Sequence, residues 1–216
     1  MVNRLLALLG GKYPLTEIDC GGFAKMKVGG MKFIIRAFHA EGLGHVSVMR
    51  AAGFFGLMKM DTLIVNPTEI DLPLYSYDYI SAMGNETLII ELYDTTLTKF
   101  DESRLLGVKA KEKYAAIPER DPGEHWYDEI KLPSSISKKG KKKQLNLIHS
   151  LADGHFDAYI SSEKLPVADR AAKQKKTDVY VGGLIEKGGP STDVFKKSIG
   201  DVLTKQLFEE ILFGTK

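Results

Sequence analysis

The sequence predicts an α+β protein in which a central, mainly antiparallel sheet is flanked by helices. Three observations predict this class. Strand-like runs fill the first half of the chain, and helix-like runs fill the second half. Two apolar runs flank Gly84-Asn85, which is typical of a β-hairpin with a two-residue turn. No helical crossover separates the strand-like runs, so neighbouring strands are expected to be antiparallel.

Five strands are expected in the first half. They are residues 32–39, 45–51, 60–65, 74–83 and 86–93. Gly29-Gly30 before the first strand and Asn66-Pro67 after the third are turn signals. Residues 52–58 form an apolar connection between the second and third strands.

The second half is expected to be helical around one long loop. Helical composition or spacing covers residues 103–114, 141–152, 163–176 and a C-terminal segment from Ser191 or Thr192 to Leu212. Ser191 or Thr192 can cap that last helix, and Gly214 follows its end. Residues 118–140 contain Pro-Gly and Pro-Ser-Ser signals and are expected to form a loop.

The length of 216 residues suits one domain, residues 1–216, because domains commonly contain roughly 100–200 residues. Hydrophobic residues make up 44% of the chain and charged residues 27%, which is ordinary for a globular protein. A chain of this size buries about 70% of the surface that its unfolded form exposes, so it needs no disulfide or metal in order to fold.

Several kinds of site are excluded by residue counts. The single cysteine, Cys20, excludes an intramolecular disulfide, a cysteine-ligated iron–sulfur cluster and a four-cysteine zinc site. The five histidines show no metal-ligand spacing, and no glycine-rich nucleotide motif follows a strand. The residues therefore give no support to an iron–sulfur cluster, a zinc site or a nucleotide site in this chain.

Targeting signals are weak. Residues 4–9 resemble the beginning of a signal peptide, but the apolar run stops at Gly10-Gly11 and no cleavage site follows. No stretch approaches the about 18 apolar residues that indicate a membrane span. We expect a short N-terminal helix in a cytoplasmic protein, with no membrane partner.

The hairpin contains two acidic residues of interest. With Gly84 and Asn85 as the turn, Asp78 faces Glu91 on a side of the sheet that also carries Ser76. Desolvation and like-charge repulsion would raise the pKa of one carboxyl group, and an acid that is protonated near neutral pH can donate a proton. Alternatively, this face is exposed and both carboxylates are simply hydrated, and the pattern favours neither reading.

Two further groups of residues have alternative interpretations. Six methionines lie in the sheet half, namely Met26, Met31, Met49, Met58, Met60 and Met83. We favour filling of core gaps; the alternative is an adaptable wall for a large, flat, apolar ligand. The basic run Lys138, Lys139, Lys141, Lys142 and Lys143 is typical of a solvated loop. It lacks the aromatic residues of a nucleic-acid surface and could instead attract an acidic protein.

The hairpin region carries a family pattern. Residues 71–80 read DLPLYSYDYI, and residues 87–94 read TLIIELYD. This order resembles the central hairpin of the ferredoxin-dependent bilin reductases and the related red chlorophyll catabolite reductases, where D-x-P-x-F/Y-x-x-D/E precedes an apolar strand ending in aspartate. Residues 60–67 are similar to their preceding strand. With residues 194–213, which are similar to their final helix, the resemblance covers roughly residues 30–100 and 190–213.

The resemblance implies an α/β/α sandwich that holds an open-chain tetrapyrrole between sheet and helices. It also implies an enzyme without flavin or metal, in which electrons arrive singly from reduced ferredoxin and pocket carboxylates supply protons through bilin radical intermediates. The acidic proton donor of the family hairpin matches Asp78, whereas the resemblance assigns nothing to Glu91. The lone cysteine agrees with a redox centre that belongs to the partner.

The chain also departs from the family. Bilin reductases of the phycocyanobilin-forming type carry a pocket Glu and a pocket His on the two preceding strands. Here residues 47–49 fall near the Glu position, and Asp61 or Thr62 falls near the His position. A different tetrapyrrole or a different site of reduction is therefore expected, unless the scaffold was kept and catalysis was lost.

The leading hypothesis is a ferredoxin-dependent reductase of a linear tetrapyrrole, with Asp78 and Glu91 as catalytic carboxylates. The predicted substrate-binding residues are His45, Arg50, Met60, Thr62, Asn66 and Ser76. Arg50 or His45 would pair with propionates, and the basic run would meet an acidic ferredoxin. The alternatives are a non-catalytic tetrapyrrole carrier on the same fold and, disfavoured by the net charge of +2, a nucleic-acid-associated protein.

Overall fold

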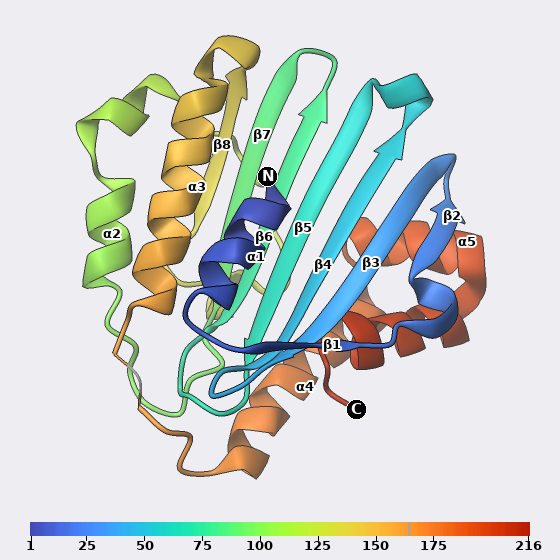
Figure 1. Ribbon diagram of the computed structural model, residues 1–216, viewed down its shortest axis with the longest axis vertical. Coiled ribbons are helices and arrows are strands. Elements are labelled where there is room, and N and C mark those ends of the chain that lie inside the picture. The colour runs from blue at the N-terminus through green and yellow to red at the C-terminus, as the bar shows by residue number, and fades with distance from the viewer. Residues whose placement is uncertain (164) are drawn as a thin grey trace.

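The strands form one antiparallel sheet in the computed structural model, which describes residues 1–163 and 165–216. Among these residues, eight strands pair in the order β1-β3-β4-β5-β6-β7-β8, and β2 pairs with β3 beside β1 (Figure 1). Their bounds are β1 Leu15–Ile18, β2 Lys25–Val28, β3 Met31–Ala40, β4 Gly44–Gly53, β5 Met58–Pro67, β6 Leu74–Ala82, β7 Asn85–Tyr93 and β8 Ile136–Lys141.

Helices cover both faces of this sheet. The α-helices are α1 Val2–Gly10, α2 Ser103–Lys109, α3 Leu145–Ile160, α4 Arg170–Lys187 and α5 Pro190–Gln206. Shorter helical turns are η1 Gly21–Phe23, η2 Phe54–Gly56, η3 Glu112–Ala116, η4 Asp128–Ile130, η5 Lys142–Gln144 and the π-type turn η6 Leu207–Leu212. In Figure 1, α1, α2 and α3 lie in front of the sheet, and α4 and α5 lie behind it. The predicted α/β/α sandwich with a mainly antiparallel sheet is confirmed.

Alternation along the strands separates two cores. Successive strand residues point to opposite faces, so Tyr75 and Tyr77 face α3 while their neighbours face α4 and α5. The Tyr75 ring packs 4.6 Å from the ring of Tyr159, centroid to centroid. On the opposite face, the Phe33 ring lies 5.3 Å from that of Phe195 of α5. The sheet therefore has a closed tyrosine-rich face and a second face that leads to the site.

The turn of the β6–β7 hairpin differs from the predicted one. Ala82 pairs with Asn85, so the turn residues are Met83 and Gly84, with φ values of 50° and 73°. Asp78 consequently lies opposite Ile89, and the predicted direct pairing of Asp78 with Glu91 is wrong. Moving a turn by one residue shifts every cross-strand partner by two positions. Because side chains alternate with a period of two, both carboxyl groups keep the predicted face.

Other differences concern the second half. The predicted 118–140 loop ends in the strand β8, which tolerates several lysines because it is an edge strand. The α3 helix begins at Leu145 rather than Lys141. The helix predicted from Glu163 begins at Arg170, where the Asp169 carboxylate accepts a hydrogen bond from the Ala172 N–H group. Lys164, inside that prediction, lies outside the described residues.

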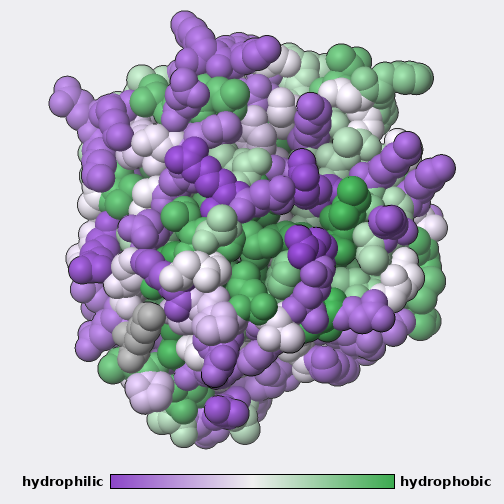
Figure 2. Space-filling model, in the orientation of Figure 1, coloured by the Kyte–Doolittle hydropathy of each residue, from purple (hydrophilic) through white to green (hydrophobic). Residues whose placement is uncertain are grey.

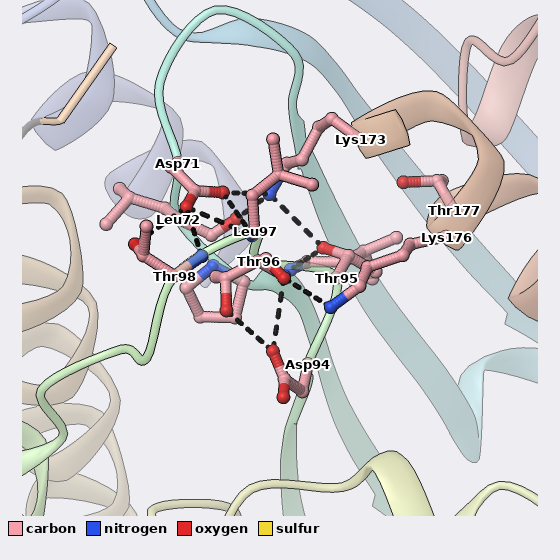
Figure 3. Close-up of polar contacts among 12 residues, drawn as sticks. Asp71, Leu72, Asp94, Thr95, Thr96, Leu97, Thr98, Lys173, Lys176 and Thr177 are labelled. Carbon is pink, nitrogen blue, oxygen red and sulfur yellow. Dashed lines mark hydrogen bonds and ion pairs between the residues drawn. The ribbon is translucent and has the colours of Figure 1, made fainter. Parts of the chain in front are cut away.

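A buried ion pair attaches α4 to the sheet. The Asp71 carboxylate accepts hydrogen bonds from the backbone N–H groups of Leu97 and Thr98 at 2.9–3.0 Å, and the Lys173 Nζ atom lies 3.4 Å away (Figure 3). Lys173 also donates to the Leu72 carbonyl at 2.5 Å. Burial lowers the pKa of Lys173 to about 8. This network fixes the position of α4, which forms part of the roof of the site.

We expect Lys173→Met to reduce the free energy of unfolding by about 3–5 kcal/mol, because it leaves a buried carboxylate without its cation. Urea unfolding at neutral pH measures this change. Lys175→Met, on an exposed position of the same helix, is the matched control and should change stability by about 0.5 kcal/mol or less. Equal effects of the two substitutions would contradict the role given to the ion pair.

Candidate functional site

A cavity of about 380 Å³ lies between the second face of the sheet and the helices behind it. Strands β3 to β7 form its floor. Helices α4, α5 and η6, with the segment before η4, form its roof. The floor residues are Met31, Phe33, Met49, Met58, Met60, Thr62, Ile64, Ser76, Asp78, Ile80, Ile89, Glu91 and Tyr93. This arrangement produces a broad apolar cavity with a few convergent polar groups, as is usual for small-molecule sites.

Methionine and aromatic side chains make up much of the wall. Met31, Met49, Met58 and Met60 all line the cavity, whereas Met83 is 88% exposed at a hairpin turn. From the sequence we favoured core filling for these six methionines. Four of them instead line the cavity, as the alternative interpretation of an adaptable wall expects. Unbranched thioether side chains adapt their shape to a ligand at small cost.

Asp78 stands on the floor of the cavity because β6 places Ser76, Asp78 and Ile80 on the same face. The Thr62 hydroxyl group of the neighbouring strand donates a 2.5 Å hydrogen bond to Asp78 Oδ1. Burial raises the pKa of Asp78 to about 6; the Thr62 hydrogen bond opposes this rise, and the Glu91 carboxylate adds to it. About half of this acid is therefore protonated at pH 6 and about one tenth at pH 7, far more than for a carboxyl group with the ordinary pKa of 3.8.

Glu91 occupies the next floor position on β7, diagonal to Asp78. The Tyr93 hydroxyl group donates to Glu91 Oε2 at 2.6 Å, and Lys131 Nζ lies 3.9 Å from Oε1. Lys131 also donates to Asp128 Oδ1 at 2.5 Å, and the Asp128 side chain is 37% exposed. A row of charged groups thus leads from the cavity floor to the protein surface.

The predicted substrate-binding residues fall into two groups. Met60, Thr62 and Ser76 line the cavity beside Asp78 and Glu91. The other three do not.

His45 and Asn66 hold the C-terminal segment against the sheet. A ring nitrogen of His45 lies 2.8 Å from the Ile211 carbonyl, and Asn66 donates to the Phe213 carbonyl at 2.7 Å. Arg50 points to the opposite face, because its strand neighbours Met49 and Ala51 belong to the core behind the sheet. Its guanidinium group is half exposed and lies 3.4 Å from Asp61. Pairing of propionates with His45 or Arg50 therefore has no support from their positions.

The roof contains polar residues that sequence reasoning missed. Arg120, His125 and Tyr127 line the cavity from the segment between η3 and η4, and Thr192 does so from α5. The His125 and Tyr127 rings stack with their centroids 4.9 Å apart. The signal was a His-Trp-Tyr cluster, residues 125–127, within a segment that has no periodicity.

The basic run is only partly available to a partner. Lys138 is buried, and its Nζ atom donates to the Ile117 carbonyl at 3.0 Å and to Glu119 at 2.6 Å. The prediction of a docking role for Lys138 is therefore at odds with its position. The other lysines, Lys139, Lys141, Lys142 and Lys143, are exposed on the edge strand and on η5.

Two features are absent from the part of the chain that the structure describes. Within residues 1–163 and 165–216, no group of three or more His, Cys, Asp or Glu side chains has the arrangement of a metal site. Over the same residues, no helix combines the length and the apolar character needed to cross a bilayer.

Comparisons with known proteins identify the fold. No protein-family model matches the chain, and neither does any curated protein sequence. A solved structure that does match is the selenomethionine form of phytochromobilin synthase from tomato in complex with biliverdin. The TM-score is 0.77 at 16% sequence identity, over 99% of this chain and 82% of that chain. The chain thus has the fold of that phytochromobilin synthase, and the fold implied by the sequence resemblance is confirmed.

We expect Asp78→Asn to stabilise the protein at about pH 8, by about 2–3 kcal/mol, and to have little effect at about pH 4. The folded-state pKa of about 6 exceeds the ordinary value of 3.8, so the folded state binds more protons between these values. Wild-type stability therefore decreases as the pH rises through this window, and the neutral amide avoids that loss. Urea unfolding at both pH values measures the difference. An equal change at both would contradict the assignment, and Thr62→Val should raise the pKa of Asp78 further.

Proposed function

We propose that this chain reduces an open-chain tetrapyrrole, with electrons from reduced ferredoxin and a proton from the Asp78 carboxyl group. The observation that carries the proposal is the position of an acid with a pKa of about 6 on the floor of a broad, methionine-lined cavity. Biliverdin is the ligand named for the tomato protein of the same fold.

The cavity suits a flat, largely apolar ligand that also carries carboxylates. Apolar side chains from the floor and the roof would contact the two faces of such a ligand. Arg120 in the roof offers a guanidinium group to a propionate, in place of Arg50. The Arg120 Nη1 atom is 3.3 Å from the Ser137 hydroxyl oxygen, which limits its freedom without neutralising its charge.

Asp78 has the properties of a proton donor. Saturating one carbon–carbon double bond consumes two electrons and two protons. Two molecules of a one-electron donor such as ferredoxin supply the electrons, and the Asp78 carboxyl group supplies one proton. After transfer, the Thr62 hydroxyl group stabilises the Asp78 carboxylate. Glu91, which Lys131 connects to the surface, is the candidate for the second proton.

A carrier without turnover is the second candidate. It is favoured by the identity of the β5 residue that pairs with Asp78, because this residue is not a histidine. Thr62 occupies this place, while Asp61 points to the other face, so the floor lacks the imidazole that the resemblance assigns near this position. His125 brings an imidazole to the cavity from the roof instead.

We expect the chain to shift the absorption spectrum of biliverdin or another linear tetrapyrrole, and to convert it when reduced ferredoxin is added without oxygen. Asp78→Asn should keep the spectral shift and lose turnover by about 100-fold or more. Arg50→Gln, on the opposite face, is the control and should change neither. Binding without conversion by the wild-type protein would favour the carrier. Absence of binding to any linear tetrapyrrole would exclude both candidates.

Ferredoxin is expected to dock near Lys139 and the exposed lysines of η5, since these surround one end of the sheet edge. Replacing Lys141, Lys142 and Lys143 by Gln should raise the KM for ferredoxin at low salt by about tenfold, and the difference should shrink at high salt. The matched control replaces three scattered exposed lysines, Lys99, Lys111 and Lys175, by Gln. An unchanged KM, or equal effects of the two triple variants, would contradict the docking site.

A further inference from the structure

Two hairpin turns carry exposed apolar side chains at one edge of the sheet. The β4–β5 connection around η2 and the β6–β7 turn both lie at the upper edge in Figure 1. Phe54 is 58% exposed, Leu57 67% and Met83 88%, and Phe55 is fully exposed. Figure 2 shows hydrophobic atoms that project at the upper right, over the β4–β5 connection. These four residues are called the tip residues below.

The backbone indicates that these apolar side chains are not a by-product of folding. In the described part of the chain, the non-glycine residues with positive φ are Phe54, Phe55 and Met83, at 51°, 54° and 50°. Bulky residues are rare in this left-handed region, where glycine or asparagine fits at little cost. Every such position thus holds a large apolar side chain directed into solvent, at the expense of backbone strain.

Positive charge surrounds the tip residues. Residues 25–34, 50–60 and 79–85 contain four exposed lysines, Lys25, Lys27, Lys32 and Lys59, and Arg50, which is paired with Asp61. The acidic residues that directly follow two of these ranges, Asp61 and Glu86, are buried. Lys59 and Lys32 both pair with Ala52, a short distance along the strands from the turn. Lys25 and Lys27 of β2 are exposed as well. The four lysines thus lie farther from the edge than the tip residues, which is the arrangement in which apolar side chains enter a membrane and lysines meet its headgroups.

We propose that this edge binds the surface of a bilayer that contains anionic lipids. The tip residues would enter the boundary between headgroups and acyl chains, and Lys25, Lys27, Lys32 and Lys59 would meet the lipid phosphates and carboxylates. The apolar side chains stand on separate turns rather than in one groove, which a fluid surface accommodates better than a folded partner does. Met58, the first residue of β5, directly follows the tip residue Leu57, and it lines the cavity together with Met31, the first residue of β3. The apolar surface of the tips therefore continues into the cavity.

The test is cosedimentation of the full chain with vesicles of phosphatidylcholine alone or with phosphatidylserine added. We expect binding to the mixed vesicles to be at least about tenfold stronger, and to weaken as salt is raised. The double variant Phe54→Asn, Phe55→Gly should lose most of this binding, because it removes two apolar tip side chains. It should also unfold at a higher urea concentration than the wild type, because Asn and Gly adopt positive φ with less strain than Phe. The matched control, Val202→Ser with Leu203→Ser, removes an exposed apolar pair from α5 and should bind like the wild type.

Three results would overturn the proposal. They are absence of binding to either vesicle, equal binding to neutral and anionic vesicles, and equal binding by the tip variant and the wild type. If the tip variant instead loses only ferredoxin-supported turnover, the edge is a protein-docking surface and the lipid proposal is wrong. Replacing Lys27, Lys32 and Lys59 by Gln should separately reduce binding to the anionic vesicles, by about fivefold for each lysine.

Discussion

The antiparallel register of β4 to β7 is the constraint on which the rest of the structure depends. Each residue of these strands belongs to one of two faces, and the chain cannot change this assignment without moving every neighbour. On one face, Tyr75 and Tyr77 close a core against α3. On the other, Thr62 and Asp78 are exposed to a cavity rather than covered by a packed helix. The two faces are linked, because the buried residues of the closed face, Tyr75 and Tyr77, keep the strands that form the cavity floor rigid.

Low polarity around a single carboxyl group is the main electrostatic feature of the site. Water would hold Asp78 ionised, but the methionine and aromatic wall removes much of that solvation. Two neighbours then change the pKa of Asp78 in opposite directions. The Thr62 hydroxyl group stabilises the charged form, and the Glu91 carboxylate disfavours it. A group set by such opposing contributions is sensitive to what fills the cavity, because a ligand displaces the remaining water.

Local patterns in the sequence predict much of this molecule, and long-range contacts explain the remainder. Alternation and turn signals were sufficient for the five central strands and for the face that Asp78, Glu91 and Ser76 share, but not for deciding that this face borders a cavity. They misplaced the hairpin turn by one residue, because Met83 adopts positive φ where the sequence suggests Asn85. Contacts of Lys138 with Ile117, and of Asn66 with Phe213, join segments far apart in the chain, and no pattern around either residue encodes them. Arg120 and His125 reach the cavity from an irregular segment for the same reason.

The displaced turn also changes the geometry of the acid pair. Directly opposed carboxyl groups on a hairpin would have Cβ atoms about 5 Å apart, whereas diagonal neighbours are about 7–8 Å apart. The staggered pair, Asp78 and Glu91, can therefore address two different atoms of one extended planar molecule instead of competing for the same atom. The atoms that the two acids reach on such a floor would be set by the position of a turn at the far end of the hairpin. Moving that two-residue turn by one residue along the chain, remote from any reacting atom, would move the second acid along the ligand by two strand residues.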